Sequence, residues 1–515
     1  MKKNKNIRIA IVASAALLLT GTLSAQQAGD ILKFSNYDWS SGTARSAAMG
    51  GAFSSLGADF SSLAINPAGL GMYQASEAGI TLGFNSLTSE TNHYELGKSQ
   101  TKSTKGHLGF NNAGMVLNLY NGSGVLTSAT IGFAYNQLID HNVTTRVRGA
   151  SPVSIADLFA EQLQTGTFYP DEIAGGLSNG NGFDRLGGML ASLAGVVGYD
   201  ETSDQFYIDA SEGTTSRFDL EKKTEGSTGQ YDFGLGLNFS NRLYLGMGFG
   251  FQDIYYRERS AYDENMEGNT YDSDWAVRHL DFIENLDQTG SAWNFKIGAV
   301  IRPVSDLRIG LALHTPTFIT MNERYGGDVQ NDAAKETGYS GYYEAQSQYR
   351  MRTPMRFIGG ISYTLAGSMI LSVDYERVWY NQMKMFWNDW NDELYDVTDN
   401  VKALYKPANN LRFGLEYVVT PNWFARMGFA SYSSMYQDVA LMKNEANFSA
   451  FTGQRLNYSA GLGYRIGNAK VDLSYVYSDT KEAPARVFAF GDVYSAAYST
   501  QRMRHNVTAS LTLRF

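Results

Sequence analysis

The chain has 515 residues, a formal net charge of −9 and no cysteine. The acidic balance argues against a nucleic acid as the main partner, because phosphate binding needs a basic face. The missing cysteines exclude thiol nucleophiles, iron–sulfur clusters and zinc–thiolate sites. We also expect no metal site and no cofactor.

Residues 1–25 have the pattern of a secretory signal peptide. Lys2, Lys3, Lys5 and Arg8 precede a short apolar run from Ile9 to Leu19. This run is too short to span a bilayer, and no later stretch has 18 consecutive apolar residues. The pattern predicts a protein that leaves the cytoplasm.

Residues 26–74 are dominated by alanine, glycine and serine and do not alternate between polar and apolar positions. Asp59 or Ser61 is placed to cap a short helix, and Gly50–Gly51 would end one. The segment closes on a tight turn formed by Asn66, Pro67, Ala68 and Gly69. We predict a compact hatch that plugs the mouth of the following domain; the alternative is a flexible leader that ends in an ordinary turn.

Period-two alternation marks the rest of the chain as β-structure. Between 506 and 515 the odd positions are apolar and the even positions are polar. The same alternation recurs at 231–239, 294–301, 411–417, 456–465 and 471–477. A soluble β-sandwich would alternate too. Here, however, the apolar sets are rich in Tyr and Phe, which is typical of the aromatic girdles of membrane barrels, and the polar sets carry charges and glycines that suit a lumen.

Turns and loops give a strand count. Short turns are predicted at 121–124, 240–242, 302–305, 366–368, 420–422 and 467–468. Long polar connections are predicted at 91–105, 141–225, 260–287, 322–348, 384–404, 436–452 and 479–499. Six turns and seven loops predict an all-β fold over 75–515, a 14-stranded antiparallel transmembrane β-barrel with both chain ends on the short-turn side.

The last strand carries an apolar alternation that ends in Leu511, Leu513 and Phe515. A terminal Phe on such a strand is similar to the insertion signal of outer-membrane barrels. The barrel-assembly machinery is therefore an expected partner.

The block ARSAAMGGAFSSLGADFSSLAINPAGL, followed by the predicted strands, resembles the FadL/TodX family of outer-membrane transporters of hydrophobic compounds. The resemblance implies the outer membrane of a Gram-negative bacterium, with its lipid and lipopolysaccharide as surroundings, and it makes Asn66, Pro67 and Ala68 the hatch motif. It also implies passive uptake of hydrophobic small molecules, either long-chain fatty acids or aromatic hydrocarbons. The steps would be lumenal binding, hatch movement and lateral release.

Two other functions stay open at this point. One is a protein-interaction barrel similar to the cargo shuttle of the type IX secretion system, whose partner would be a secreted protein. The other is a general porin, which would show steady ion conductance where a plugged transporter shows little.

A fatty acid needs a cation for its carboxylate. The candidate inward-facing cations are Arg308, Arg412, Arg426 and Arg465. The alternative is structural: these arginines would pair with lumenal carboxylates to stabilise the barrel. The carboxylates in question are Asp232, Asp374, Glu376, Glu416 and Asp472.

The longest connection contains two amphipathic pieces. Ile155, Leu158 and Phe159 share a helical face in the first, and Met189 and Leu193 lie in the second. They form either an apolar landing site for a ligand or two helices that pack on each other over the barrel rim.

Few features of the sequence indicate an enzyme. The chain has one G-x-S-x-G match, at Gly176–Gly180, but it lies in a Gly-rich loop and not on the strand–turn–helix of a nucleophile elbow. We expect no catalytic residues.

If the barrel is correct, the protein without its signal peptide will need detergent to stay monodisperse, because its outer face is apolar. Size-exclusion chromatography with and without detergent checks this. A stable monomer in plain buffer would disprove the membrane barrel.

Overall fold

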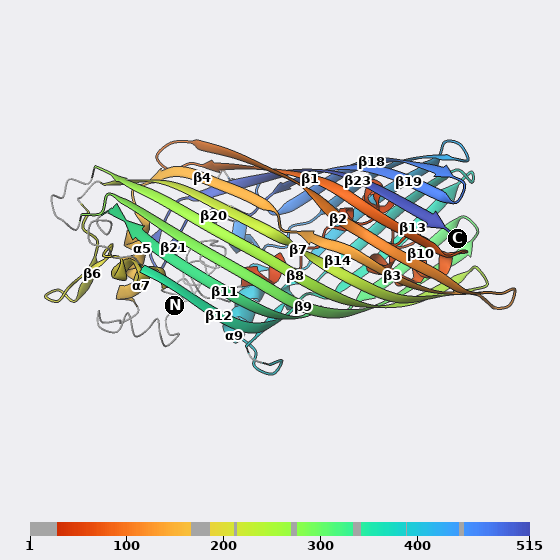
Figure 1. Ribbon diagram of the computed structural model, residues 1–515, viewed down its shortest axis with the longest axis horizontal. Coiled ribbons are helices and arrows are strands. Elements are labelled where there is room, and N and C mark those ends of the chain that lie inside the picture. The colour runs from red at the N-terminus through yellow and green to blue at the C-terminus, as the bar shows by residue number, and fades with distance from the viewer. Residues whose placement is uncertain are drawn as a thin grey trace.

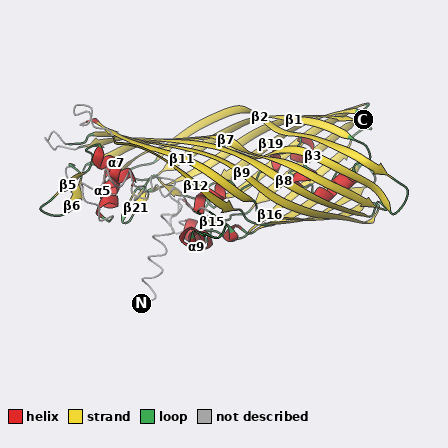
Figure 2. Ribbon diagram, turned by 60° about the horizontal axis from the view of Figure 1, so that its bottom comes forward, coloured by secondary structure: helices red, strands yellow, loops and turns green. Residues whose placement is uncertain are grey.

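A computed structural model describes residues 28–165, 186–210, 214–268, 276–332, 341–387, 389–441 and 448–515. Within these ranges the chain forms one long antiparallel barrel with helical segments inside it and at one end (Figures 1 and 2). The predicted signal peptide at 1–25 lies outside the described residues. Among the described residues, no helix is long and apolar enough to cross a membrane.

The barrel wall closes on itself and has fourteen staves, by which we mean positions in the wall that are filled by one strand or by two consecutive strands end to end. Three staves are split into two strands each: β3 with β4, β11 with β10, and β12 with β13. Closure comes from β1 and β23, which pair from Glu77↔Arg514 to His93↔Tyr498. The wall strands, in chain order, are β1 (Glu77–His93), β2 (Ser99–Asn121), β3 (Leu126–Asp140), β4 (Val143–Ser151), β7 (Thr215–Phe239), β8 (Leu243–Glu267), β9 (His279–Val304), β10 (Leu307–His314), β11 (Phe318–Asn331), β12 (Gly341–Arg352), β13 (Arg356–Leu365), β14 (Met369–Val378), β16 (Ala408–Val418), β17 (Trp423–Tyr432), β18 (Gln454–Ile466), β19 (Ala469–Lys481) and β23 (Ala497–Arg514).

Shorter elements complete the fold. The strands are β5 (Gly198–Asp200), β6 (Gln205–Tyr207), β15 (Lys384–Phe386), β20 (Ala485–Arg486), β21 (Ala489–Phe490) and β22 (Val493–Tyr494). The helices outside the hatch are α5 (Ile155–Gln164), α7 (Leu186–Leu193), η4 (Tyr380–Gln382), α9 (Tyr395–Leu404) and η5 (Asp438–Leu441).

All six predicted short turns join paired neighbouring strands at one end of the barrel, which we call the turn end. The chain ends there too, beside Ser76, whose carbonyl accepts the Phe515 N–H at 3.0 Å (Figure 1). The opposite end, which carries the long connections, is the loop end. In barrels of this class it is extracellular.

An apolar band surrounds the turn-end half of the wall. Its upper border is a row of aromatic side chains directly opposite one another on five neighbouring staves: Tyr135, Tyr231, Phe251, Trp293 and Phe318. Aromatic rings prefer the bilayer interface, so this row marks the outer border of the membrane.

The prediction that 141–225 and 260–287 are loops is wrong in part, because β4, β7, β8 and β9 continue far beyond the aromatic row. Above the row the alternation reverses. Phe218, Tyr262 and Phe282 point inward and are buried, while Asp219 and Asp263 point outward. Outside the membrane the outer face of the wall contacts water, so the apolar side chains point inward. The polar outer face is the reason why the sequence predicts polar connections for these segments.

The hatch fills the lumen at membrane depth. It consists of α2 (Ala28–Lys33), η1 (Trp39–Ser41), α3 (Ala44–Ala48), α4 (Ser62–Ile65) and η2 (Pro67–Met72). As predicted, the α3 helix ends just before Gly50 and Gly51, whose φ angles are +64° and +72°. The described hatch begins beside Tyr256, in the middle of β8, and runs down to the turn end. Its start therefore lies inside the barrel and not at the short-turn side as predicted.

Wall glycines make room for the hatch. A Cβ on Gly246 would overlap the backbone of Pro67 and Ala68, and a Cβ on Gly298 would overlap Asn66 Oδ1. A Cβ on Gly236 would likewise overlap Gly71 N. The hatch motif is thus seated directly on the backbone of β7, β8 and β9.

We predict that Gly298→Val loosens the hatch and lowers the free energy of unfolding by about 1–3 kcal/mol, the usual cost of overpacking. Urea unfolding in detergent and hydrogen exchange at 54–68 measure the two effects. Gly124→Val is the matched control, since a Cβ there meets no atom within 4 Å. Equal stability and exchange in both variants would contradict the prediction.

Candidate functional site: the hatch and the cavity above it

The Asn-Pro-Ala motif ties the hatch to itself and to the wall. Asn66 caps η2, and its Oδ1 accepts a hydrogen bond from Ala68 N at 3.1 Å. Its Nδ2 donates to Ser54 O at 2.6 Å and to Ala299 O of β9 at 3.3 Å. Pro67 is the first residue of η2, where a missing N–H costs nothing. One asparagine side chain thus joins a turn, a hatch loop and a wall strand.

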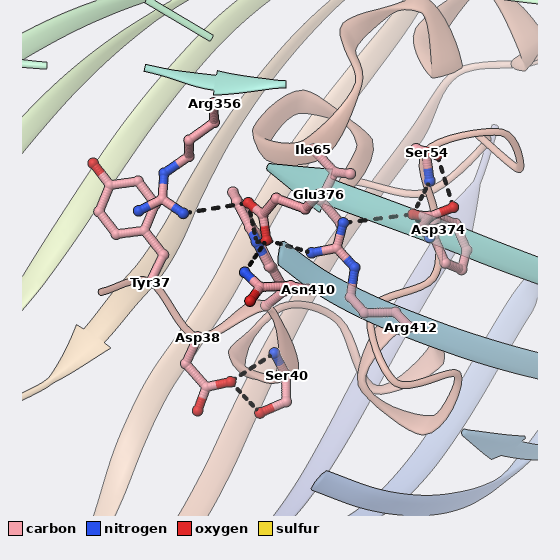
Figure 3. A network of polar contacts seen from close by, with 12 residues as sticks. Tyr37, Asp38, Ser40, Ser54, Ile65, Arg356, Asp374, Glu376, Asn410 and Arg412 are labelled. Carbon is pink, nitrogen blue, oxygen red and sulfur yellow. Dashed lines mark hydrogen bonds and ion pairs between the residues drawn. The ribbon is translucent and has the colours of Figure 1, made fainter. Parts of the chain in front are cut away.

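Buried carboxylates hold the other side of the hatch (Figure 3). Asp374 of β14 accepts hydrogen bonds from the backbone N–H groups of Phe53 and Ser54, both at 2.9 Å, and from Ser54 Oγ at 2.7 Å. Glu376 of the same strand accepts from Trp39 Nε1 at 3.1 Å. Hydrogen bonds to charged groups are stronger than neutral ones, so β14 is the main anchor of the hatch.

Two of the four predicted arginines belong to this anchor. Arg412 is fully buried, with Nη1 at 3.3 Å from Glu376 and Nη2 at 3.7 Å from Asp374. Arg426 is fully buried as well and contacts Glu416 at 2.6 Å and Asp472 at 2.8 Å. The geometry therefore favours the structural alternative for Arg412 and Arg426: they stabilise the barrel and its hatch.

The other two predicted arginines lie near the turn end. Arg308 is half-buried at the start of β10, and Arg465 is exposed beside the last turn of β18. The structure does not bring the four arginines together.

A cavity of about 500 Å³ lies above the hatch. Among the described residues that line it, none is one of the four predicted arginines. Hatch residues 29–38 contribute to its floor, and β3, β4, β7, β8, β9, β11, β18 and β23 contribute to its walls. Its volume, its position against the hatch and its mixture of apolar and charged side chains make it the candidate ligand site.

Three arginines form one wall of this cavity: Arg455 of β18 and Arg502 and Arg504 of β23. Arg455 and Arg504 share Asp38 of the hatch, at 4.0 and 3.4 Å, and these two arginines lower the pKa of Asp38 although burial alone would raise it. Arg502 pairs with Glu482 at 2.8 Å. The Nε atoms of Arg455 and Arg502 are buried without a hydrogen-bond partner among the described residues.

The opposite wall is acidic and carries its own cations. Glu258 pairs with Lys222 at 2.5 Å, and Glu284 accepts a hydrogen bond from the Tyr325 hydroxyl at 2.9 Å. Lys33 of the hatch contacts Asp30 at 2.8 Å. Burial acts against the Lys33 charge, but Asp30 and Glu258 raise its pKa above the ordinary value. On this wall the acidic groups Asp30, Glu258 and Glu284 offset the charges of Lys33 and Lys222.

The wall of the barrel is interrupted next to this cavity. The ladder between β2 and β3 begins at Asn121↔Ser128 and stops at Asn112↔Asn136, so the remaining part of β2, 99–111, pairs with β1 alone. Past Asn136 the chain bulges against β7 and continues as β4, which contacts β2 by side-chain bonds such as Ser103 Oγ to Thr144 O at 2.6 Å. Ile139, Asp140, His141 and Val143, at this interruption, line the cavity.

The two amphipathic loop pieces form helices α5 and α7, and these pack on each other at the loop end (Figure 2). Ile155, Leu158, Phe159 and Met189 are buried, and the Phe159 ring meets Phe282 of β9 edge-on at 5.3 Å between centroids. Leu193 is 36% exposed. Packing over the rim is therefore the interpretation that the structure favours; a ligand-binding role of these residues stays a prediction. The G-x-S-x-G match at Gly176–Gly180 lies outside the described residues.

The arginine wall is the part of the site that the sequence analysis missed. Arg502 and Arg504 continue the inward-facing positions of Asn506, Thr508 and Ser510. That parity is the sequence signal for the two arginines, but the apolar alternation that predicts the last strand covers only 506–515.

The fold and the cavity define a plugged outer-membrane barrel with a binding chamber above its plug. Comparison with protein families agrees: the family described as outer membrane protein transport protein (OMPP1/FadL/TodX) matches residues 228–513. The chain belongs to this family, so it is an outer-membrane transport protein and not an enzyme.

Solved structures show the same fold at low sequence identity. A FadL homologue of Pseudomonas aeruginosa aligns with a TM-score of 0.55 and 12% identity, over 93% of this chain and 99% of that one. The toluene transporter TodX of Pseudomonas putida aligns with a TM-score of 0.50 and 12% identity, over 92% of this chain and 98% of that one. A search of curated proteins finds no significant match.

We predict that Asp374→Ala lowers the free energy of unfolding by about 3–5 kcal/mol, because it leaves two hatch N–H groups without an acceptor in the interior and removes one of the two carboxylates beside Arg412. Urea unfolding in detergent, followed by tryptophan fluorescence, measures this change. Asp399→Ala on the exposed face of α9 is the control, with an expected effect within about 0.5 kcal/mol. A small change for both variants would show that Asp374 does not anchor the hatch.

Proposed function

We propose that the protein takes up amphiphilic hydrophobic molecules with an acidic head group, such as long-chain fatty acids. The ligand binds in the cavity above the hatch and leaves sideways between β2 and β3–β4. The observation that carries this proposal is the arginine wall of a partly apolar chamber, in which the Nε atoms of Arg455 and Arg502 are buried without a hydrogen-bond partner among the described residues.

The acidic head group would bind at Arg455 and Arg504. Their shared contacts to Asp38, at 4.0 and 3.4 Å, are long compared with the 2.6 and 2.8 Å contacts of Arg426. Buried donors without partners are costly, and a carboxylate that accepts from the free Nε of Arg455 removes this cost.

The alkyl chain would lie against apolar side chains of the same cavity: Leu87, Ile139, Val147, Leu220 and Leu286. Each buried CH₂ contributes about 0.8 kcal/mol to transfer from water. A neutral aromatic hydrocarbon would also gain transfer free energy from this apolar surface, but it has no carboxylate to pair with the arginines. The wall therefore favours fatty acids over aromatic hydrocarbons.

A ligand carboxylate would compete with Asp38 for the arginines, and this competition couples ligand binding to the position of the hatch. Asp38 also connects the hatch to β3 through its N–H, which donates to Leu138 O at 3.0 Å. A ligand carboxylate that replaces Asp38 at Arg455 and Arg504 weakens the hold on 28–38, while the rest of the hatch stays anchored by Asp374 and Glu376. Movement would then be confined to the segment beside the interruption of the wall.

A porin would need an open water-filled channel, whereas the described hatch residues are packed against the wall on both sides. This packing supports a plugged transporter.

We predict that Arg455→Gln and Arg504→Gln weaken binding of hexadecanoic acid about ten- to a hundredfold, which corresponds to one lost charged hydrogen bond. Displacement of a fluorescent fatty acid from the purified protein in detergent measures the affinity. Arg465→Gln, outside the cavity, is the matched control.

The methyl ester of hexadecanoic acid has no charge, so its affinity should be equal in all variants. Equal binding of acid and ester by the unaltered protein would contradict the arginine wall as head-group site.

A further inference from the structure

A second apolar hollow lies on the outside of the barrel, within the lipid-facing band. This outer groove has a volume of about 460 Å³. Its lining is almost entirely apolar and comes from β2, β3, β7, β8 and β9: Met115, Leu117, Ile131, Gly132, Phe133, Phe233, Gly234, Leu235, Met247, Gly248, Phe249 and Phe295.

Strand register explains the shape of the groove. Met115, Phe133, Phe233, Phe249 and Phe295 are successive cross-strand partners and form one outward row. Leu117, Ile131, Leu235, Met247 and Ile297 form the next outward row. Between the rows β3, β7 and β8 carry glycine, so only backbone separates the lumen from lipid on these three strands. The rows cross five staves, which is about 19 Å at about 4.8 Å per strand. This is the shape of a site for an extended alkyl chain.

The floor of the groove is shared with the hatch. Gly132 and Gly234 contact Leu63 and Leu70 of the hatch on their inner side, and Gly248 faces Pro67. The hatch motif and the outer groove thus lie on the two sides of the same thin part of the wall.

The groove also adjoins the interruption of the wall. Pairing of β2 with β3 stops at Asn112↔Asn136, and the groove begins at Met115↔Phe133, three residues further along β2 on the same two strands. A molecule that leaves the cavity past Ile139 and Val143 therefore meets this groove first.

We propose that the outer groove is the site that receives the alkyl chain of the released ligand before it diffuses into the bilayer. The proposal rests on the proposed function, since it concerns the same ligand. In lipid there is no hydrophobic gain, so the groove holds the chain by packing alone. Binding is weak and short-lived there, which suits release.

Photolabelling tests the site. The probe is a long-chain carboxylic acid with a diazirine near the end of its chain, added to the protein in lipid nanodiscs, with adducts mapped by mass spectrometry. Because the chain has no cysteine, Ser103→Cys with Thr144→Cys gives a pair that a bismaleimide links, which closes the interruption. A groove-filling variant is Met247→Trp, and its matched control is Leu473→Trp on β19; the two native side chains are 51% and 52% exposed.

We expect labels in both cavity and groove of the unaltered protein and of Leu473→Trp. In the linked variant and in Met247→Trp, the cavity label should stay and the groove label should fall to the level of other lipid-facing peptides.

A groove label that persists in the linked variant overturns the proposal, because the groove then takes acyl chains from the membrane directly. A cavity label without a groove label overturns it as well and leaves the proposed function standing. Absence of both labels overturns both.

Discussion

The structure depends on one constraint: in lipid, every backbone N–H and C=O must find a partner within the protein. Pairing of β1 with β23 closes the barrel. Beyond the aromatic row that contains Tyr135 this constraint no longer holds, because water can satisfy a free edge there. Above Asn112↔Asn136 the edge of β2 loses its ladder, and only side-chain bonds such as Ser103 to Thr144 bridge it to β4. This interruption lies beside the cavity, where the proposed sideways release would need it.

The hatch is held in two different ways. On β7, β8 and β9 the hatch packs closely against wall glycines such as Gly298, and these contacts are van der Waals contacts. On β14, β16 and β17 it is fixed by buried charges, with Asp374 and Arg412 at the centre (Figure 3). Removing one partner of a buried ion pair is far costlier than losing a packing contact, so the body of the hatch is a fixed part of the barrel. Its first segment, 28–38, lines the cavity; Ile31 and Phe34 are buried there, and Asp38 has longer contacts to Arg455 and Arg504.

The chemistry of the cavity follows from which charges are left incompletely paired. Arg412 and Arg426 each pair with two carboxylates of the barrel wall. Arg455 and Arg504 share one carboxylate that belongs to the hatch. The same residue type thus anchors the plug in one layer and is free to exchange partners in the next. This difference is the reason why we propose an acidic ligand for this member of a family of hydrophobic-compound transporters.

The sequence by itself determined the barrel, its fourteen strands, the six tight turns and the hatch motif, because period-two alternation and turn chemistry are local properties of the chain. It did not reveal the upper wall, because the alternation reverses where lipid gives way to water and Phe218 and Tyr262 point inward. Nor did it identify Arg455, Arg502 and Arg504. Whether an arginine is satisfied depends on strands far away in the chain, and only the closed barrel brings Asp38 next to residues more than four hundred positions later.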